Sequence, residues 1–206
     1  MNNLSPRPNA AFAVLLATCW WVFSAASLAA EPNGAPRYQA ATSEEVAAAF
    51  WNWHAATQPS GALTREELAP VRSIVTTELA CLLELAEQFK LHFSKLAPGE
   101  KPPFAEGDLF TSSAFERPTA FTIESVQINA ATASAVTRFD SEDKVNWHDR
   151  LQLRLQDGEW RVANVERSGP FEFGNRGSLV QELYSAMSQD IPGGSWSGRR
   201  ARNCKE

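Results

Sequence analysis

The sequence predicts an α+β domain, with N-terminal helices packed on a curved antiparallel sheet of four strands and a short C-terminal helix. Three observations predict it. Apolar residues recur at helical spacing between Val46 and Phe93, alternate with polar residues within 121–166, and return to helical spacing within 177–188. A run of helices followed by a run of strands is typical of α+β domains and not of alternating α/β folds.

The first residues of the chain have the layout of a secretory signal peptide. An apolar run at 10–30 follows the single charge of Arg7 and ends in small residues, with cleavage favoured near Ala29 or Ala30. We therefore expect residues 1–29 to be a signal peptide and the mature protein to be periplasmic or secreted. A single-span membrane anchor is the alternative, but we expect no stable membrane insertion after cleavage.

Lipid attachment is a weaker alternative for the same segment. Leu16 to Cys19 resembles a bacterial lipoprotein signal, in which the cysteine becomes the lipidated first residue. Thr18 stands where a small Gly, Ala or Ser is usual, and the apolar run continues past Cys19. We therefore do not expect a lipoprotein.

Composition indicates one globular domain with extensions. The chain has 206 residues, of which 44% are apolar and 21% charged, with a formal net charge of −5. Residues 30–41 bear Pro and Gly and read as a linker, residues 42–189 form the domain, and the basic residues 190–206 are expected to be a disordered tail. The acidic domain excludes nucleic acid as a partner.

Capping boxes predict where the first two helices begin. Thr42 is followed by Glu45, and Thr64 by Glu67, each at the spacing of a capping box. Pro70 indicates that the second helix is short or kinked. The third helix covers about 76–96, and its apolar stripe is wide enough to cover a sheet. This stripe consists of Leu79, Leu82, Leu83, Ala86, Phe89 and Phe93.

An irregular segment separates this helix from the strands. Pro and Gly residues end the helix, and the stretch Gly107 to Pro118 is polar at intervals. We expect Phe104, Phe110 and Phe115 to anchor it on the domain.

Four strands are predicted at 121–128, 133–139, 145–156 and 159–166. The first changes its alternation near Ser125, which indicates a bulge. The third is the longest: its odd positions are apolar except for Asp149, and its even positions are polar. Asp157-Gly158 between the last two strands is a two-residue hairpin turn.

The hairpin turn predicts a pairing with chemical consequences. If the strands pair without interruption, Leu153 lies opposite Val162, and Asp149 opposite Glu166. Two carboxylates that face each other on an inner surface drive their pKa values apart. Asp149 and Glu166 are therefore the candidate catalytic pair, one of them a general acid or base. The alternative places Asp149 at a bulge or rim, paired with Arg150, Arg167 or solvent.

The chain resembles the nuclear-transport-factor-two-like superfamily, and within it a family of small exported bacterial domains of unknown function. The resemblance covers about 43–188. It rests on Phe50-Trp51-Asn52-Trp53, Gly107-Asp108-Leu109-Phe110, the strand pair 151–165 and Gly177-Ser178-Leu179. It implies a cone-shaped fold with an internal cavity, and possible sheet-to-sheet dimers. It implies no particular activity, because the superfamily contains enzymes, binding modules and interaction domains.

Side chains that could line such a cavity are mostly aromatic. The ligand-pocket candidates are Phe50, Trp53, His54, Trp147, Leu151 and Trp160, although the aromatic ones are more simply explained as core. His54 lies beside the aromatic stripe of the first helix, where it could line the cavity with Trp51, but we expect it on the helix surface.

The remaining histidines and the cysteines indicate no metal or cofactor site. His148 is placed on the outer face of its strand and His92 on the polar side of its helix, and the cysteines are not clustered, so we expect no metal and no cofactor. Cys81 falls in an apolar helical pattern typical of a buried thiol. A disulfide to Cys204 is permissible in an exported protein but is not the favoured reading.

Three functions remain open from sequence. The first is a binding or interaction module for a small ligand or a protein partner, and the second an isomerase, dehydratase or hydrolase that uses Asp149. The third is an immunity or inhibitor protein. The outer face with His148, Arg150, Gln152 and Arg154 has no apolar stripe, so we expect a monomer or a weak homodimer.

Overall fold

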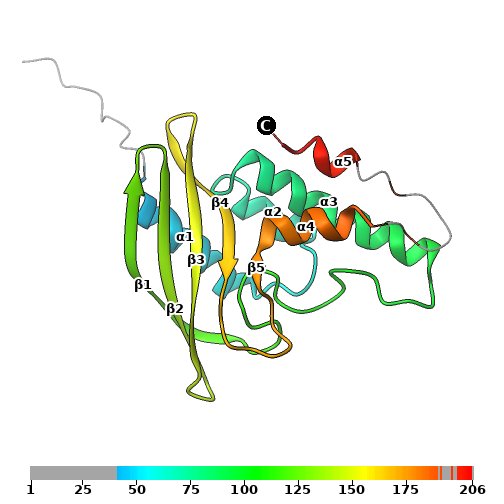
Figure 1. Ribbon diagram of the computed structural model, residues 1–206, viewed down its shortest axis with the longest axis horizontal. Coiled ribbons are helices and arrows are strands. Elements are labelled where there is room, and N and C mark those ends of the chain that lie inside the picture. The colour runs from blue at the N-terminus through cyan, green and yellow to red at the C-terminus, as the bar shows by residue number, and fades with distance from the viewer. Residues whose placement is uncertain (1–40, 190, 192–195, 197–198, 206) are drawn as a thin grey trace, which may run out of the picture. The chain divides into compact units, whose positions relative to one another are not determined.

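The computed structural model describes residues 41–189, 191, 196 and 199–205, and all of them belong to one compact unit, Gln39–Glu206 (Figure 1). The predicted signal peptide, Cys19 and residues 30–40 of the predicted linker lie outside the described residues.

Three helices come first, and their local signals are confirmed. α1 (Ser43–Thr57) and α2 (Arg65–Val71) each begin with a complete capping box, from Thr42 with Glu45 and from Thr64 with Glu67. α2 has seven residues and contains Pro70 in its last turn. α3 (Thr77–Leu96) is capped by Thr76, and every residue of its predicted apolar stripe is buried.

The sheet has five antiparallel strands in the order β1-β2-β3-β4-β5. These are β1 (Pro118–Asn129), β2 (Thr132–Ser141), β3 (Asn146–Gln156), β4 (Glu159–Arg167) and β5 (Gly177–Ser178). The α+β class is therefore confirmed. The predicted four-stranded sheet gains a short fifth strand, because Gly177 and Ser178 pair with the end of β4 before α4 begins.

The register contains three irregularities, two in the β1–β2 pairing and one in the β3–β4 pairing. The predicted bulge in β1 is confirmed, since the pairing shifts between Ile123 and Ser125. β3 and β4 pair as predicted from the Asp157-Gly158 turn as far as Leu153 opposite Val162. Beyond that point a bulge at Ala163 shifts the register by one residue.

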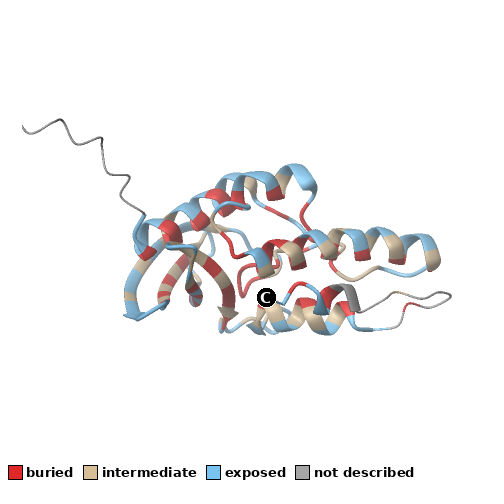
Figure 2. Ribbon diagram, turned by 90° about the horizontal axis from the view of Figure 1, so that it is seen from above, coloured by how far each residue is buried: buried red, intermediate tan, exposed pale blue. Residues whose placement is uncertain are grey.

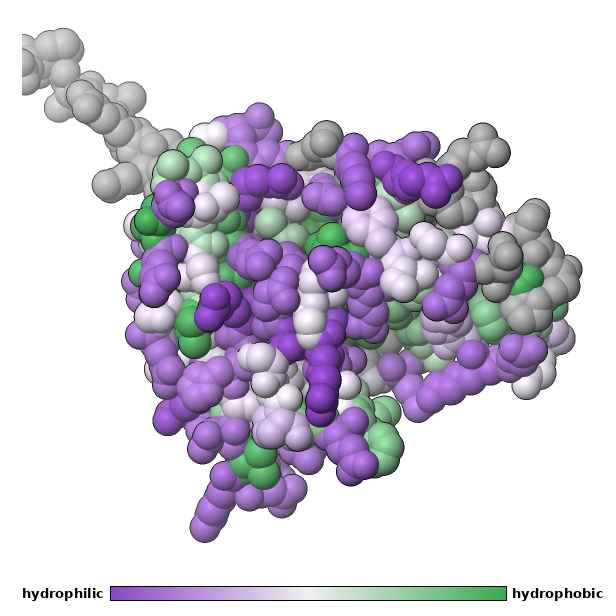
Figure 3. Space-filling model, viewed as in Figure 1, coloured by the Kyte–Doolittle hydropathy of each residue, from purple (hydrophilic) through white to green (hydrophobic). Residues whose placement is uncertain are grey.

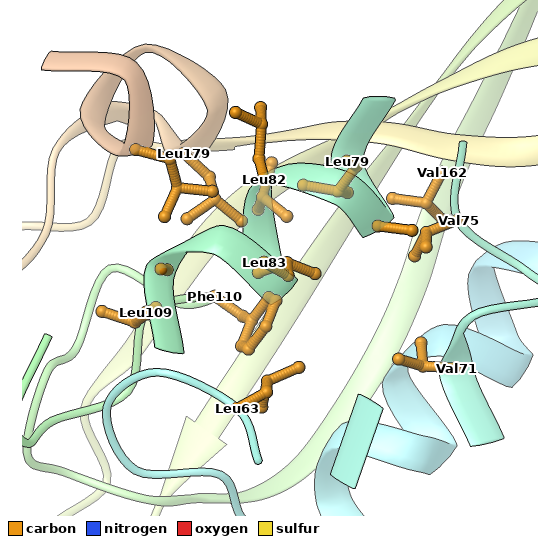
Figure 4. Close-up of a cluster of buried hydrophobic side chains, with 14 of the residues drawn as sticks. Leu63, Val71, Val75, Leu79, Leu82, Leu83, Leu109, Phe110, Val162 and Leu179 are labelled. Atoms are coloured by element: carbon orange, nitrogen blue, oxygen red, sulfur yellow. The ribbon is translucent and has the colours of Figure 1, made fainter. Parts of the chain in front are cut away.

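Helices cover one face of the sheet and its β4 edge. α1 crosses the inner face, while α3 and α4 (Leu179–Met187) contact β4 and each other (Figure 1). Buried residues gather on the sides of helices and strands that face one another (Figure 2). Apolar side chains from α3, β4, α4 and the segments between them meet in one cluster, which includes Leu79, Leu83, Phe110, Val162 and Leu179 (Figure 4).

The C-terminal residues are tied to the domain, which corrects two expectations. α5 (Arg199–Arg202) contacts α3, and Cys204 forms a disulfide with Cys81 of that helix. Ala201 and Cys204 are buried, and the Trp196 ring lies 5.1 Å from that of Phe89. The prediction of a disordered tail is therefore wrong for 199–205, and so is the prediction that Cys81 is a free thiol. A covalent bond fixes a segment that composition alone would leave free.

A tyrosine joins α4 to the start of α3. The hydroxyl of Tyr184 donates a hydrogen bond of 2.9 Å to Glu78, and burial together with this carboxylate raises the pKa of Tyr184 well above its ordinary value.

This contact predicts a late tyrosine titration. The sequence has two tyrosines, Tyr38 and Tyr184. Because the folded-state pKa of Tyr184 is raised, its contribution to stability is complete below pH about 10 and is lost as the pH rises further. We expect the absorbance of tyrosinate to show a delayed step in the wild-type chain that is missing in Tyr184→Phe. A single step near pH 10 that accounts for both tyrosines of the wild-type chain would contradict this.

Candidate functional site

Asp149 is a buried anchor for two loops. Its side chain on β3 is 1% exposed and accepts hydrogen bonds at both oxygens. Oδ2 accepts from the Ser112 amide at 2.8 Å and from Trp147 Nε1 at 3.1 Å, while Oδ1 accepts from the Ser168 amide at 3.0 Å and from the Ser112 hydroxyl. Burial raises the pKa of Asp149, and these hydrogen bonds oppose the rise. The carboxylate therefore holds residues 107–117, the Asp108 loop, against residues 168–176, the Gly174 loop.

The predicted carboxylate pair does not form. The bulge at Ala163 places Asp149 opposite Arg167, and Glu166 opposite Arg150 on the other face of the sheet. There Glu166 accepts hydrogen bonds from Gln152 at 3.3 Å and from Asn164 at 2.8 Å. The prediction that Glu166 faces inward beside Asp149 is therefore wrong.

Arg167 is a second buried anchor, but not the partner of Asp149. Its guanidinium is ion-paired with Glu182 of α4 at 2.6 Å and donates to the Leu109 carbonyl at 2.9 Å. It also donates to the Gly177 carbonyl at 3.1 Å. The arginine thereby links β4 to the Asp108 loop, β5 and α4.

The two loops are packed without space for an extra methyl group. The Asn175 side chain donates to the Asp108 and Thr111 carbonyls, and the Gly169 amide donates to the Ser112 hydroxyl at 2.7 Å. A Cβ added at Gly174 would lie 2.2 Å from the carbonyl oxygen of Ser112.

Gly174→Ala is therefore expected to lower the free energy of unfolding by about 1–3 kcal/mol, because the backbone of one loop must move. Gly99→Ala is the matched control, since a Cβ there meets nothing within 4 Å. Urea unfolding of both variants measures the difference. Equal midpoints for the two variants would show that the loops are not packed as described.

Most of the predicted pocket residues lie in the hydrophobic core. Phe50, Trp147 and Leu151 are at most 2% exposed, Trp53 is 9% exposed, and Trp160 is partly buried against the same core. The rings contact one another, as in Phe139 stacked on Trp147 with centroids 5.3 Å apart. The surfaces of these side chains are therefore used in packing.

His54 is the exception among the predicted pocket residues. It lies in the last turn of α1, is 4% exposed, and its Nε2 is 2.8 Å from Oδ2 of Asp108. The expectation of a surface histidine is wrong, because α1 also buries Trp51, whose Nε1 donates to Thr137 of β2 at 2.9 Å. The ring of Trp51 meets that of His54 edge to face.

Asp108 is held in place by its own loop. Oδ1 accepts from the Phe110 amide at 2.7 Å, and Oδ2 accepts from the Thr111 hydroxyl at 2.9 Å as well as from His54. An aspartate that accepts from the amide two residues later forms an Asx turn, which fixes its carboxylate at the start of the loop. The position of the acceptor for His54 is thus set locally.

A pocket of about 370 Å³ opens beside this pair. We call it the His54 pocket; it is lined by His54 and Ala55 of α1 and by residues 58–60, 106–108 and 114–118. Phe115 is 69% exposed at this pocket, so the predicted anchoring by Phe115 is wrong, whereas Phe104 and Phe110 are buried as predicted.

The hydrogen bond to Asp108 determines what His54 can do. A carboxylate only accepts, so Nε2 carries the proton, and in the neutral ring Nδ1 keeps a lone pair. No hydrogen bond within the described part of the chain reaches Nδ1 of His54. His54 can therefore accept a hydrogen bond or a proton from a bound molecule.

The other histidines have no part in this pocket. His148 is exposed on the outer face, as predicted, with Nε2 3.1 Å from Glu124. His92 is half-buried next to the Trp196 ring. Within the described residues, no three His, Cys, Asp or Glu side chains are placed to hold a metal ion.

Sequence reasoning missed Asp108, the residue that positions His54. The available signal was an aspartate after glycine in a segment without helical or strand periodicity, a pattern typical of an Asx turn. It also missed Ser112 and Ser168 as donors to Asp149, because the donors lie on segments far from β3 in sequence.

In comparisons with known proteins, no protein family model, no curated protein and no solved structure matched the chain. In the part of the chain that the structure describes, no helix is both long and apolar enough to cross a bilayer.

Proposed function

We propose that the chain is an exported binding module for a small ligand, and that the ligand binds in the His54 pocket. The observation that carries this proposal is the hydrogen-bonded pair of buried His54 and partly buried Asp108 beside a pocket of about 370 Å³. Ligand sites combine a concave surface with a few polar groups held in fixed positions. Asp108 fixes His54, and the fold fixes Asp108.

Two further features support the proposal. Phe115 is an exposed aromatic side chain on the wall of the pocket, where it offers apolar surface to a ligand. The disulfide between Cys81 and Cys204 suits an oxidising compartment, which agrees with export.

The order of helices and the antiparallel sheet are compatible with a nuclear-transport-factor-two-like domain, and we propose that relationship for the fold. In this proposal the ligand site lies at the end of α1 and on the Asp108 loop, because Phe50, Trp53 and Trp147, which could have lined an internal cavity, are packed in the core.

A second candidate function is proton-transfer catalysis, in which His54 replaces Asp149 as the general base. The lone pair on Nδ1 favours it, since a base oriented by a carboxylate is a recurring catalytic arrangement. A reaction that His54→Asn stops while a ligand still binds would distinguish this candidate from simple binding. The immunity or inhibitor role stays a prediction.

The outer face of the sheet is poorly suited to a stable dimer interface. Hydrophilic residues prevail on the side opposite α1 (Figure 3), and His148, Arg150 and Gln152 are exposed there. A monomer or weak homodimer therefore remains our expectation.

Filling the pocket tests the proposal. Ala55 and Ala56 are exposed neighbours on α1, and of the two only Ala55 lines the His54 pocket. The mature chain is incubated with a small-molecule extract of its expression host and examined by native mass spectrometry. We expect a non-protein adduct on the wild type and on Ala56→Trp, and none on Ala55→Trp.

Two results would contradict the proposal. One is an adduct that persists on Ala55→Trp, because the ligand would then bind elsewhere. The other is a wild-type chain that stays bare in the extract.

A further inference from the structure

A second hollow adjoins the His54 pocket and differs from it in character. It has a volume of about 270 Å³ and shares His54, Ala55 and Pro118 with the first. Its other walls are mainly apolar and come from Trp51, Phe121 and Phe139. An apolar cavity of about 150 Å³ already accepts benzene, so this hollow has room for a phenyl-sized group.

Charges in the His54 pocket are mostly negative. Glu106, Asp108 and Glu116 contribute to its wall, against the single cation Arg117. The guanidinium of Arg117 donates to the side-chain amide of Gln58 at 2.5 Å, so its nearest partner is a neutral group.

The three carboxylates differ in their hydrogen-bond and ion-pair partners. Glu106 is paired with Lys101, and Asp108 is committed to His54 and to its own loop. The carboxylate of Glu116 has no hydrogen bond or ion pair among the residues that the structure describes. An exposed, unpaired carboxylate at a pocket attracts a cation.

We propose that the ligand is an amphiphilic amine, meaning a protonated amino group joined by a short link to an aromatic or compact aliphatic group. This inference rests on the function proposed for the His54 pocket. The ammonium group donates to Glu116 and to Nδ1 of His54, a residue that lines both hollows. The apolar group enters the hollow between α1 and β1, next to Phe121.

The charge sign gives the proposal its selectivity. With Glu106 paired to Lys101, Asp108 and Glu116 outnumber the single pocket cation Arg117, so an anion of the same shape is disfavoured. A neutral alcohol would keep the apolar contacts but lose the charge attraction. Because the carboxylate is exposed, the attraction is modest and is weakened by salt.

Three probes of one shape test this selectivity. The mature wild-type chain is titrated with 2-phenylethylamine, 2-phenylethanol and 3-phenylpropionate, and each dissociation constant is obtained from amide shifts in NMR spectra. We expect the amine to bind best and the carboxylate to bind worst. Glu116→Gln should raise the dissociation constant of the amine about three- to fivefold and leave that of the alcohol unchanged. Glu142→Gln, on the exposed turn between β2 and β3, is the control and should change neither.

Each contrary result has a separate meaning. If the alcohol or the carboxylate binds as tightly as the amine, or if Glu116→Gln leaves amine binding unchanged, the amine proposal is overturned while the pocket stands. If no probe shifts the amides around Ala55 but an extract adduct is lost in Ala55→Trp, again only the ligand class is wrong. If there is neither probe binding nor such an adduct, both proposals fail.

Discussion

Removing the disulfide is expected to lower the free energy of unfolding by about 3–5 kcal/mol, because a cross-link over a loop of more than about 100 residues restricts the unfolded chain strongly. Cys81 and Cys204 are 123 residues apart in sequence, so all five strands and α4 lie between them. Cys204→Ser in urea unfolding without reductant measures the effect. We also expect 199–205 to become sensitive to protease in this variant.

The neighbouring substitution Asn203→Ser provides the control, since Asn203 is exposed beside the cysteine and keeps the bond intact. Reductant should lower the urea midpoints of the wild type and of Asn203→Ser by similar amounts and leave the midpoint of Cys204→Ser unchanged. If Cys204→Ser unfolds at the wild-type urea midpoint, the cross-link does not stabilise the domain.

Asp149→Asn is the second substitution with a large expected effect. An asparagine places an amino group where one carboxylate oxygen accepts two hydrogen bonds, so two donors lose their acceptor in a largely buried site. We expect the free energy of unfolding to fall by about 2–5 kcal/mol, since each buried unsatisfied group costs about 1–3 kcal/mol. Urea unfolding measures it.

Asp143→Asn makes the same chemical change on the exposed turn between β2 and β3 and should have almost no effect. Comparing the two variants separates the loss of the buried hydrogen bonds from the general effect of removing one negative charge. If both variants keep wild-type stability, Asp149 does not anchor the two loops. An enzyme that uses Asp149 would then again be an alternative to ligand binding in the His54 pocket.

Local signals explain the parts of the fold that could be predicted. The capping boxes at Thr42 and Thr64 and the stripe on α3 depend on residues within a few positions of one another, and the structure confirms them. The Asp157-Gly158 turn likewise fixed the first part of the β3–β4 pairing.

The register error near Asp149 has a physical cause that the sequence partly contains. Inward residues of a regular strand lie an even number of positions apart, but Val162 and Val165 are both fully buried at a separation of three. A bulge between them lets both enter the core, and it turns Glu166 outward and Arg167 inward. The spacing of the two valines was the signal for this bulge.

The pocket itself could be predicted only in part. His54 was a candidate because it lies next to the aromatic residues of α1, but its partner Asp108 is 54 residues away on a loop without periodicity. No local rule joins two such segments. The same holds for the disulfide. Composition indicated a disordered tail, but Cys204 is bonded to Cys81, which is 123 residues away in sequence.

Hydrogen–deuterium exchange with and without the small-molecule extract tests most directly whether the His54 pocket is a ligand site. Our account predicts slower exchange in the segments 54–61 and 106–118 of the wild type and of Ala56→Trp, and no change in Ala55→Trp. Protection confined to another surface, such as the outer face around Ser134 and Gln152, would contradict it.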